Sequence, residues 1–173
     1  MPTFLLDSYQ TTSAWLGLPA TWIAVLVPAL VTLAAFIRHP VTRAELLAVL
    51  VGILATCASA KVTEVHGVLA LHSTPWYTFA LLLCAGLQWY LPPIFKGFGA
   101  VWIVLVVSDF IRMTWALATF PVIQLPLGIG GAGWGDALFI DPVVTALTLW
   151  ALAFCRQHHP GFDTRFSRFI HSL

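Results

Sequence analysis

The sequence predicts an all-α fold, a polytopic membrane bundle of about five transmembrane helices with an amphipathic helix at its C-terminal end. Of its 173 residues, 60% are hydrophobic and only 9% are charged, whereas roughly a quarter of the residues of a soluble domain are charged. A soluble fold of this size is excluded, because small domains leave much of their surface in water. The apolar residues also form runs of about 20, the length that crosses a hydrocarbon layer about 30 Å thick.

Charge and cysteine content exclude further classes. Eight Lys and Arg residues nearly cancel seven Asp and Glu residues, so there is no basic surface for nucleic acid. Cys57, Cys84 and Cys155 fall inside apolar runs without the spacing of redox or zinc sites. We therefore expect no nucleic-acid partner, no metal and no cofactor, and one membrane domain over 1–173.

The first predicted span covers 18–37 and ends at Arg38-His39-Pro40, where proline stops a helix. The preceding segment, 1–17, contains no Lys or Arg and so lacks the charged start of a secretory signal. We expect this first helix to be retained, with 1–17 as an outer N-terminal segment.

The second predicted span, 43–61, opens with Thr42-Arg43-Ala44-Glu45, a capping-box pattern that satisfies first-turn amides. Small residues then recur at every fourth position: Ala44, Ala48, Gly52, Thr56 and Ala60. Such a stripe lets two membrane helices approach closely. It predicts a tight helix-packing interface; the alternative is that alanine is simply common in membrane helices.

Three more spans follow. The third, 75–91, opens at Thr74-Pro75 and closes at Pro92-Pro93, since proline suits the first turn and stops a helix. The fourth is 99–120, and the fifth is 137–155.

Two segments leave the number of spans between four and six. Residues 62–73 either extend the second helix or lie at the membrane interface. Residues 121–135 contain five glycines and form either an outer loop or a segment that re-enters the bilayer.

The C-terminal tail, 156–173, changes character. Phe162, Phe166, Phe169 and Leu173 have helical spacing, which predicts an amphipathic helix in the headgroup plane. A partner protein's groove is the alternative.

Basic residues set the predicted orientation. Six of the eight fall on one side of the five-span arrangement: Arg38, Arg43, Lys96, Arg156, Arg165 and Arg168. Because basic loops stay in the cytoplasm, we expect the N-terminus outside and the C-terminus in the cytoplasm, in a bacterial inner membrane. Tryptophans near predicted span ends agree with this register.

Asp109 and Arg112 are the only charges near the middle of a predicted span. They lie three residues apart and share a helical face. Because each costs about 2.5–3.5 kcal/mol at mid-bilayer, they must pair or face a polar interior. One interpretation is an ion pair that docks the helix. The other is an ion- or proton-binding carboxylate with Arg112 as modulator or anion clamp.

Span five has its own polar line, formed by Asp141, Thr145 and Thr148 at helical spacing. Asp141-Pro142 is also typical of a helix start. It indicates either a helix broken at this point, as occurs around transported ligands, or a proline kink.

One local motif, Gly133-Trp134-Gly135-Asp136, is similar to the G-x-G-D signature of intramembrane aspartyl proteases of the presenilin and prepilin-peptidase class. The resemblance covers four residues. It implies that Asp136 is one catalytic aspartate and makes Asp109 its partner, since two close carboxylates can share a proton and activate water.

Three functional hypotheses follow. The leading one, which is not enzymatic, is a transport or channel component for an ion or small solute, with a path along Asp109, Arg112, Asp141, Thr145 and Thr148. It would act in the lipid bilayer as a homo-oligomer or with other membrane subunits. The second is a non-transporting membrane subunit or scaffold. The third is an intramembrane aspartyl hydrolase using Asp109 and Asp136.

Overall fold

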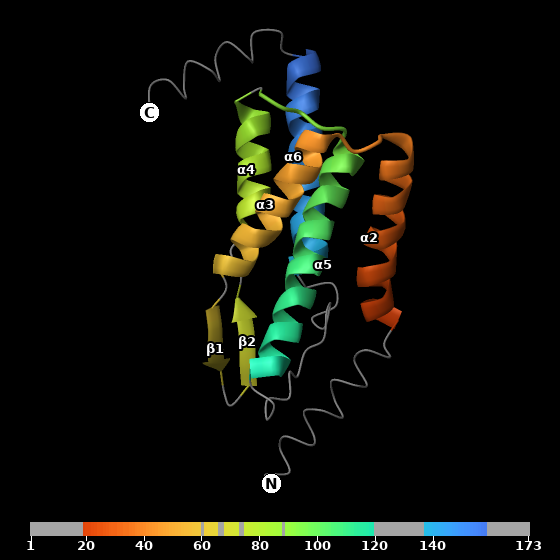
Figure 1. Ribbon diagram of the computed structural model, residues 1–173. Coiled ribbons are helices and arrows are strands. Elements are labelled where there is room, and N and C mark those ends of the chain that lie inside the picture. Colours follow the sequence, from red (N-terminus) through yellow and green to blue (C-terminus); the bar gives the residue numbers. More distant parts are fainter. Residues whose placement is uncertain are drawn as a thin grey trace.

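The computed structural model describes residues 19–59, 61–65, 68–72, 75–87, 89–119 and 137–158. These residues form a bundle of helices and one antiparallel hairpin (Figure 1). The elements are α2 (Pro19–Arg38), α3 (Arg43–Ser59), β1 (Lys61–Val65), β2 (Val68–His72), α4 (Trp76–Gly86), α5 (Ile94–Thr119) and α6 (Ala137–His158). The predicted helical bundle is therefore confirmed.

The hairpin is the exception to the predicted all-α class. Lys61 pairs with His72 and Val65 with Val68 across β1 and β2. The second helix therefore does not extend through this stretch, and its position at the membrane interface stays a prediction. The β-branched residues of this stretch fit a pleated strand better than a helix, which gives a physical reason for the difference.

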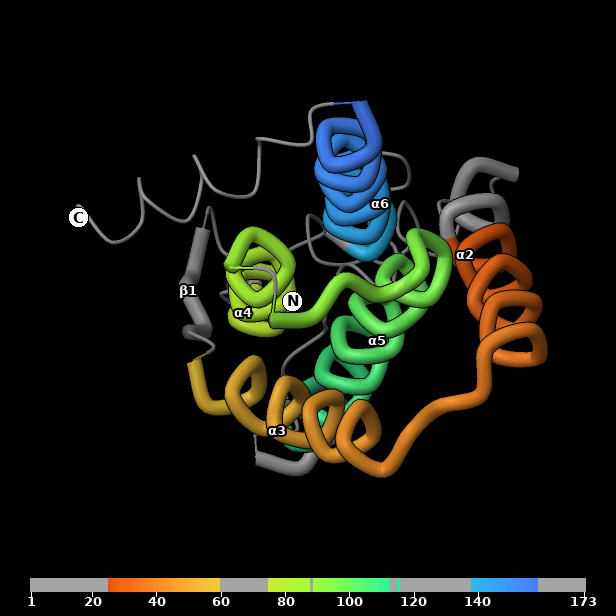
Figure 2. Tube along the Cα trace, turned by 90° about the horizontal axis from the view of Figure 1, so that it is seen from above, coloured from red at the N-terminus to blue at the C-terminus, as the bar shows by residue number. Residues whose placement is uncertain are grey.

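Helix α5 is the centre of the bundle. It packs against α6, α2, α3 and, less extensively, α4, and it lies between them when the bundle is viewed along its axis (Figure 2). Glycine permits one of these contacts: a Cβ at Gly99 would lie 3.0 Å from the Cγ2 and 3.2 Å from the Cα of Thr32 in α2. The backbones of α5 and α2 are therefore in close contact.

The hydrophobic core forms where α4, α5 and α6 meet, from Leu81, Val101, Leu105 and Leu138. Around it, the distribution differs from that of a typical soluble domain, because several polar side chains are buried while large apolar side chains are exposed. Polar side chains are buried: Thr32, Thr56, Thr78, Lys96, Ser108, Arg112 and Thr145. Large apolar side chains cover the outside, among them Ile37, which is 74% exposed, and Leu54, which is 68% exposed.

By length and composition, two helical segments of the described chain could cross a membrane, Ile94–Arg112 and Leu138–His158. α5 begins at Ile94, five residues before the predicted start at 99, and the amides of Lys96 and Gly97 both donate to the Pro93 carbonyl at 2.9 Å. Proline thus marks the start of this helix as well as the end of the preceding segment.

α4 is shorter than the predicted span 75–91 and ends at Gly86. The Leu87 amide still donates to the Leu83 carbonyl at 2.8 Å, but the amides of Trp89 and Tyr90 both turn back to the Cys84 carbonyl, at 3.0 and 3.3 Å. The chain therefore leaves the helix before Pro92-Pro93 forces it to.

The broken-helix interpretation of Asp141-Pro142 is wrong, because α6 is one continuous helix that includes Pro142. Proline lacks an amide hydrogen, so it cannot donate the usual helical bond to the carbonyl four positions earlier, yet the helix continues through it. The predicted amphipathic tail, apart from 156–158, and the segments 1–17 and 121–135 lie outside the described residues.

The helices run alternately up and down, so basic residues gather at one end of the bundle (Figure 1). We call this the basic end: it holds the α2–α3 and α4–α5 connections and the last turn of α6, with Arg38, Arg43, Lys96 and Arg156. The hairpin lies at the opposite end.

Replacing Gly99 tests the close α2–α5 contact. Gly99→Val adds side-chain atoms against the Thr32 backbone, and overpacking of this kind costs about 1–3 kcal/mol. We expect that loss in the free energy of unfolding of the purified protein in detergent. The control Ala34→Val, at an exposed position of α2, should change it by less than about 0.5 kcal/mol. Equal effects in the two variants would contradict the contact.

Candidate functional site

The predicted capping box is confirmed at the start of α3. The Thr42 amide donates to Glu45 Oε2 at 2.7 Å, and the Glu45 amide donates to Thr42 Oγ1 at 3.3 Å. These reciprocal bonds satisfy amides that the first turn leaves without helical partners. They also fix the Glu45 carboxylate at the basic end.

Glu45 in α3 is the centre of a polar cluster that joins α3 to α5 and to the α2–α3 and α4–α5 connections. Lys96 Nζ, from the first turn of α5, lies 2.7 Å from Glu45 Oε1 and 2.8 Å from Oε2. It also donates to the Pro40 carbonyl in the α2–α3 connection at 3.1 Å. The Tyr90 hydroxyl, from the α4–α5 connection, donates to Glu45 Oε1. The two charges therefore compensate each other while the cluster holds both connections against α5.

Two arginines donate to carbonyls in the last turns of neighbouring helices. Arg112 Nη2 on α5 donates to the Cys57 carbonyl in α3, and Arg156 Nη2 on α6 donates to the Ala85 carbonyl in α4 at 2.7 Å. The last four carbonyls of a helix have no intrahelical donor, and a cation there also interacts favourably with the helix dipole. Both arginines thus link neighbouring helices and satisfy backbone groups.

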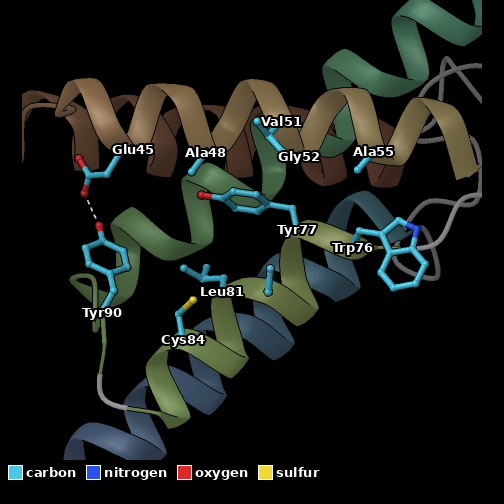
Figure 3. Close-up of a pocket in the computed structure, with 11 residues that line it drawn as sticks. Glu45, Ala48, Val51, Gly52, Ala55, Trp76, Tyr77, Leu81, Cys84 and Tyr90 are labelled. Atoms are coloured by element: carbon cyan, nitrogen blue, oxygen red, sulfur yellow. Dashed lines mark hydrogen bonds between the residues drawn. The ribbon is translucent and has the colours of Figure 1, made fainter.

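A cavity of about 290 Å³ opens between α3 and α4. Small residues of α3, including Ala48, Gly52 and Ala55, form one wall, and Tyr77 lies on the opposite wall. α4 slopes away from α3, and the bonded pair of Glu45 and Tyr90 spans the wide end (Figure 3). The cavity therefore combines apolar walls with one polar end.

Part of the predicted small-residue stripe faces this cavity. Ala44 and Ala48 are exposed, whereas Gly52 and Thr56 are buried. A Cβ at Gly52 would lie 3.0 Å from the Cβ and Cγ of Tyr77 in α4, so that position is in close contact within the chain. Ala60 lies outside the described residues.

The predicted path residues divide between α5 and α6. Arg112 is buried and Asp109, one turn earlier, is half-buried; the bond of Arg112 runs to α3 rather than α6. On α6, the Thr145 and Thr148 hydroxyls donate to the carbonyls of Asp141 and Val144 in their own helix, each at 2.8 Å. Their grouping as a solute path stays a prediction.

The sequence alone does not predict the cluster of Glu45, Lys96 and Tyr90. The capping box explains Glu45 locally, and the sequence uses Lys96 only as a basic residue on the predicted cytoplasmic side. A signal was nevertheless available, because the five-span arrangement already placed both connections at the same end. Opposite charges next to two connections at the same end indicate an ion pair between residues that are far apart in the sequence.

Within the described residues, no three His, Cys, Asp or Glu side chains lie close enough together to hold a metal ion. Asp136, which the aspartyl-protease resemblance requires, lies outside the described residues. Comparisons of the chain with protein-family models, curated proteins and solved structures found no match. The basis for a functional assignment is therefore the geometry of the bundle.

Removing the Glu45 charge tests the cluster. Glu45→Gln leaves Lys96, whose side chain is only 10% exposed, without its counter-charge, and hydrogen bonds to charged groups are each worth about 1.5–3 kcal/mol. We expect a loss of about 2 kcal/mol in the free energy of unfolding in detergent.

The matched control is Arg43→Gln, an exposed residue in the same helical turn, which should cost less than about 0.5 kcal/mol. In the double variant with Lys96→Met, the second change should cost less than it does alone. Additive losses would show that Glu45 and Lys96 are not coupled.

Proposed function

We propose that the protein is a polytopic membrane protein of a bacterial inner membrane, with its basic end in the cytoplasm and the start of α2 outside. Four of the six Lys and Arg residues in the described chain support this orientation, because they lie at the basic end. The apolar segment of α5 ends at Arg112, near the other end. Large apolar side chains on the outside would then face lipid.

Exposed aromatic residues support the same register. Trp89 and Tyr90 lie at the basic end, and Trp76 and Trp115 lie towards the opposite end, all of them exposed. Tryptophan and tyrosine are enriched at both membrane–water interfaces, where the ring meets headgroups. Aromatic residues at both ends are the arrangement expected of a bundle that spans the layer.

Helix lengths support a crossing by most of the helices. At 1.5 Å per residue, the 20 residues of α2, 26 of α5 and 22 of α6 reach about 30, 39 and 33 Å, and the 17 residues of α3 reach about 26 Å. The 11 residues of α4 reach only about 17 Å. In this arrangement α4 crosses part of the layer, and the hairpin continues beyond it.

The cavity between α3 and α4 carries the functional proposal: the protein is a transport component that binds a small amphiphilic solute there. Its rim includes the exposed residues Ala48, Val51 and Trp76, so a solute dissolved in lipid can enter from the side. The apolar walls contact the hydrocarbon part of the solute, while Glu45 and Tyr90 offer hydrogen bonds to its polar group.

The cavity volume narrows the class of solute. It is about twice the roughly 150 Å³ of an apolar cavity that binds benzene. Aromatic rings of Trp76 and Tyr77 line it and favour an aromatic ligand. We therefore expect a molecule of about two rings with one hydroxyl or similar polar group.

A membrane scaffold or partner subunit is the second candidate, and a specific observation favours it. Lys96, Arg112 and Arg156 each donate to a carbonyl of another segment, so these charges have structural uses without any transported solute. Both candidates are compatible with a homo-oligomer or with other membrane subunits.

Cysteine labelling tests the proposed orientation in a background without the three native cysteines. A cysteine at His39, exposed at the basic end, should react with a membrane-impermeant maleimide only after the cells are permeabilised. A cysteine at Glu64 in β1 should react in intact bacterial cells, because the hairpin would lie outside. Equal labelling of both positions in intact cells would contradict the orientation.

Filling the cavity tests the proposed solute site. Ala48→Leu adds three carbons to its wall and should weaken binding of labelled 1-naphthol to the protein in detergent at least tenfold, with a matching loss of naphthol flux in proteoliposomes. Ala58→Leu, at an exposed position of α3 outside the cavity, is the matched control. Equal binding by both variants excludes the cavity as the site, and wild-type binding without flux favours the scaffold.

A further inference from the structure

The buried Arg112 guanidinium has more hydrogen-bond donors than acceptors around it. Its side chain is almost completely enclosed, with the residue 8% exposed. One N–H from Nη2 goes to the Cys57 carbonyl, while Nε and Nη1 have no hydrogen-bond partner within the part of the chain that the structure describes. A guanidinium carries five N–H groups in one plane, so most of its donors remain available.

The available donors include a complete fork. A guanidinium presents two edges on which parallel N–H groups from neighbouring nitrogens point the same way, one formed by Nε and Nη2 and one by Nη1 and Nη2. Because Nη2 has two hydrogens, one on each edge, a single bond to the Cys57 carbonyl occupies only one of the edges. The other edge keeps both of its donors, in the geometry that matches two oxygens of a carboxylate or phosphate.

Arg112 lies far from the basic end, although the nitrogens without a partner are themselves buried. The residue ends the apolar segment Ile94–Arg112 and lies 16 residues beyond Lys96, or about 24 Å along α5 at 1.5 Å per residue. Its acceptor, the Cys57 carbonyl, lies in the last turn of α3, which ends at Ser59. The guanidinium therefore lies towards the end opposite the basic end, which in the proposed orientation is the end near the outer headgroups.

Burial of a charged group is costly, and a bound anion lowers that cost. The contacts to α3 do not supply one: the Cys57 carbonyl is neutral, and the neighbouring polar contacts of this seam are those of Ser108 Oγ to the Ile53 carbonyl at 3.5 Å and of Cys57 Sγ to the Ser108 carbonyl at 3.9 Å. All of these groups are uncharged.

We propose that Arg112 binds a small oxyanion, a carboxylate or phosphate group, through the free edge of its guanidinium. This site is separate from the cavity between α3 and α4, which Arg112 does not line, and it holds whether or not that cavity binds a solute. The two parallel N–H groups favour an oxyanion over a halide ion, because a halide ion interacts with the positive charge but has no second atom to accept the second hydrogen bond.

The test uses the full chain in a maltoside detergent, which contains no phosphate, with inorganic phosphate, acetate and chloride as probes at constant ionic strength. Calorimetric titration should show saturable binding of phosphate or acetate, at least tenfold tighter than binding of chloride. Arg112→Lys keeps the charge but removes the fork, and it should weaken oxyanion binding at least tenfold. Arg43→Lys, an exposed arginine of α3, should bind as the wild type does.

A lipid phosphate and a soluble oxyanion are distinguished by repeating the titration in nanodiscs. If a phospholipid headgroup occupies the site, soluble phosphate binds in detergent but no longer binds in phosphatidylglycerol nanodiscs, and native mass spectrometry detects a retained lipid that Arg112→Lys loses. If the ligand is a soluble oxyanion, binding is the same in both environments. Either result supports the oxyanion site.

Several results would overturn the proposal. Wild-type protein that binds no oxyanion in detergent and retains no lipid has no such site, a conclusion that does not depend on the folding of any variant. Equal affinity for chloride and phosphate rules out the fork. Binding that is absent in the wild type but present in Asp109→Asn would make the Asp109 carboxylate the counter-ion of Arg112.

Discussion

The architecture depends on satisfying backbone carbonyls where helices end among apolar neighbours. Water is scarce in such surroundings, and each unsatisfied group costs several kcal/mol in lipid. The last turn of α4 shows a nearly complete solution: the Leu83 and Cys84 carbonyls accept from amides of the following connection, and the Ala85 carbonyl accepts from Arg156. Basic residues thus hold neighbouring helices together, in addition to supporting the proposed orientation.

Helix α5 makes contacts of this kind with several neighbouring segments and so positions them relative to one another. Near its start, Lys96 bonds the α2–α3 connection and Glu45, while Gly99 allows α2 to approach. Further along, Arg112 bonds the last turn of α3. Two cations on one helix therefore fix its register against α3 at both ends. The apolar side chains between these two contacts then only have to pack against one another. A few polar contacts are therefore enough to position an apolar chain.

The sequence predicts elements defined by local chemistry better than contacts between elements. Proline and the capping box locate helix starts closely, as at Thr42 and Glu45. The β1–β2 hairpin is missed because its apolar, β-branched residues fit a helix or a strand until a partner strand is known. The pairing of Glu45 with Lys96 is missed for a related reason: it joins residues 51 positions apart, and no periodicity encodes that separation.

The residue type at position 112 helps to distinguish a structural role of this side chain from a role in binding a ligand. If the side chain served only to satisfy the Cys57 carbonyl, a lysine would suffice, as Lys96 does for the carbonyl of Pro40. Arginine cannot lose its proton in a protein and brings five donors, of which the described contact uses one. In a chain with so little charge, a buried cation with unused donors is poorly explained by helix docking alone. Its excess capacity is the physical argument for a ligand.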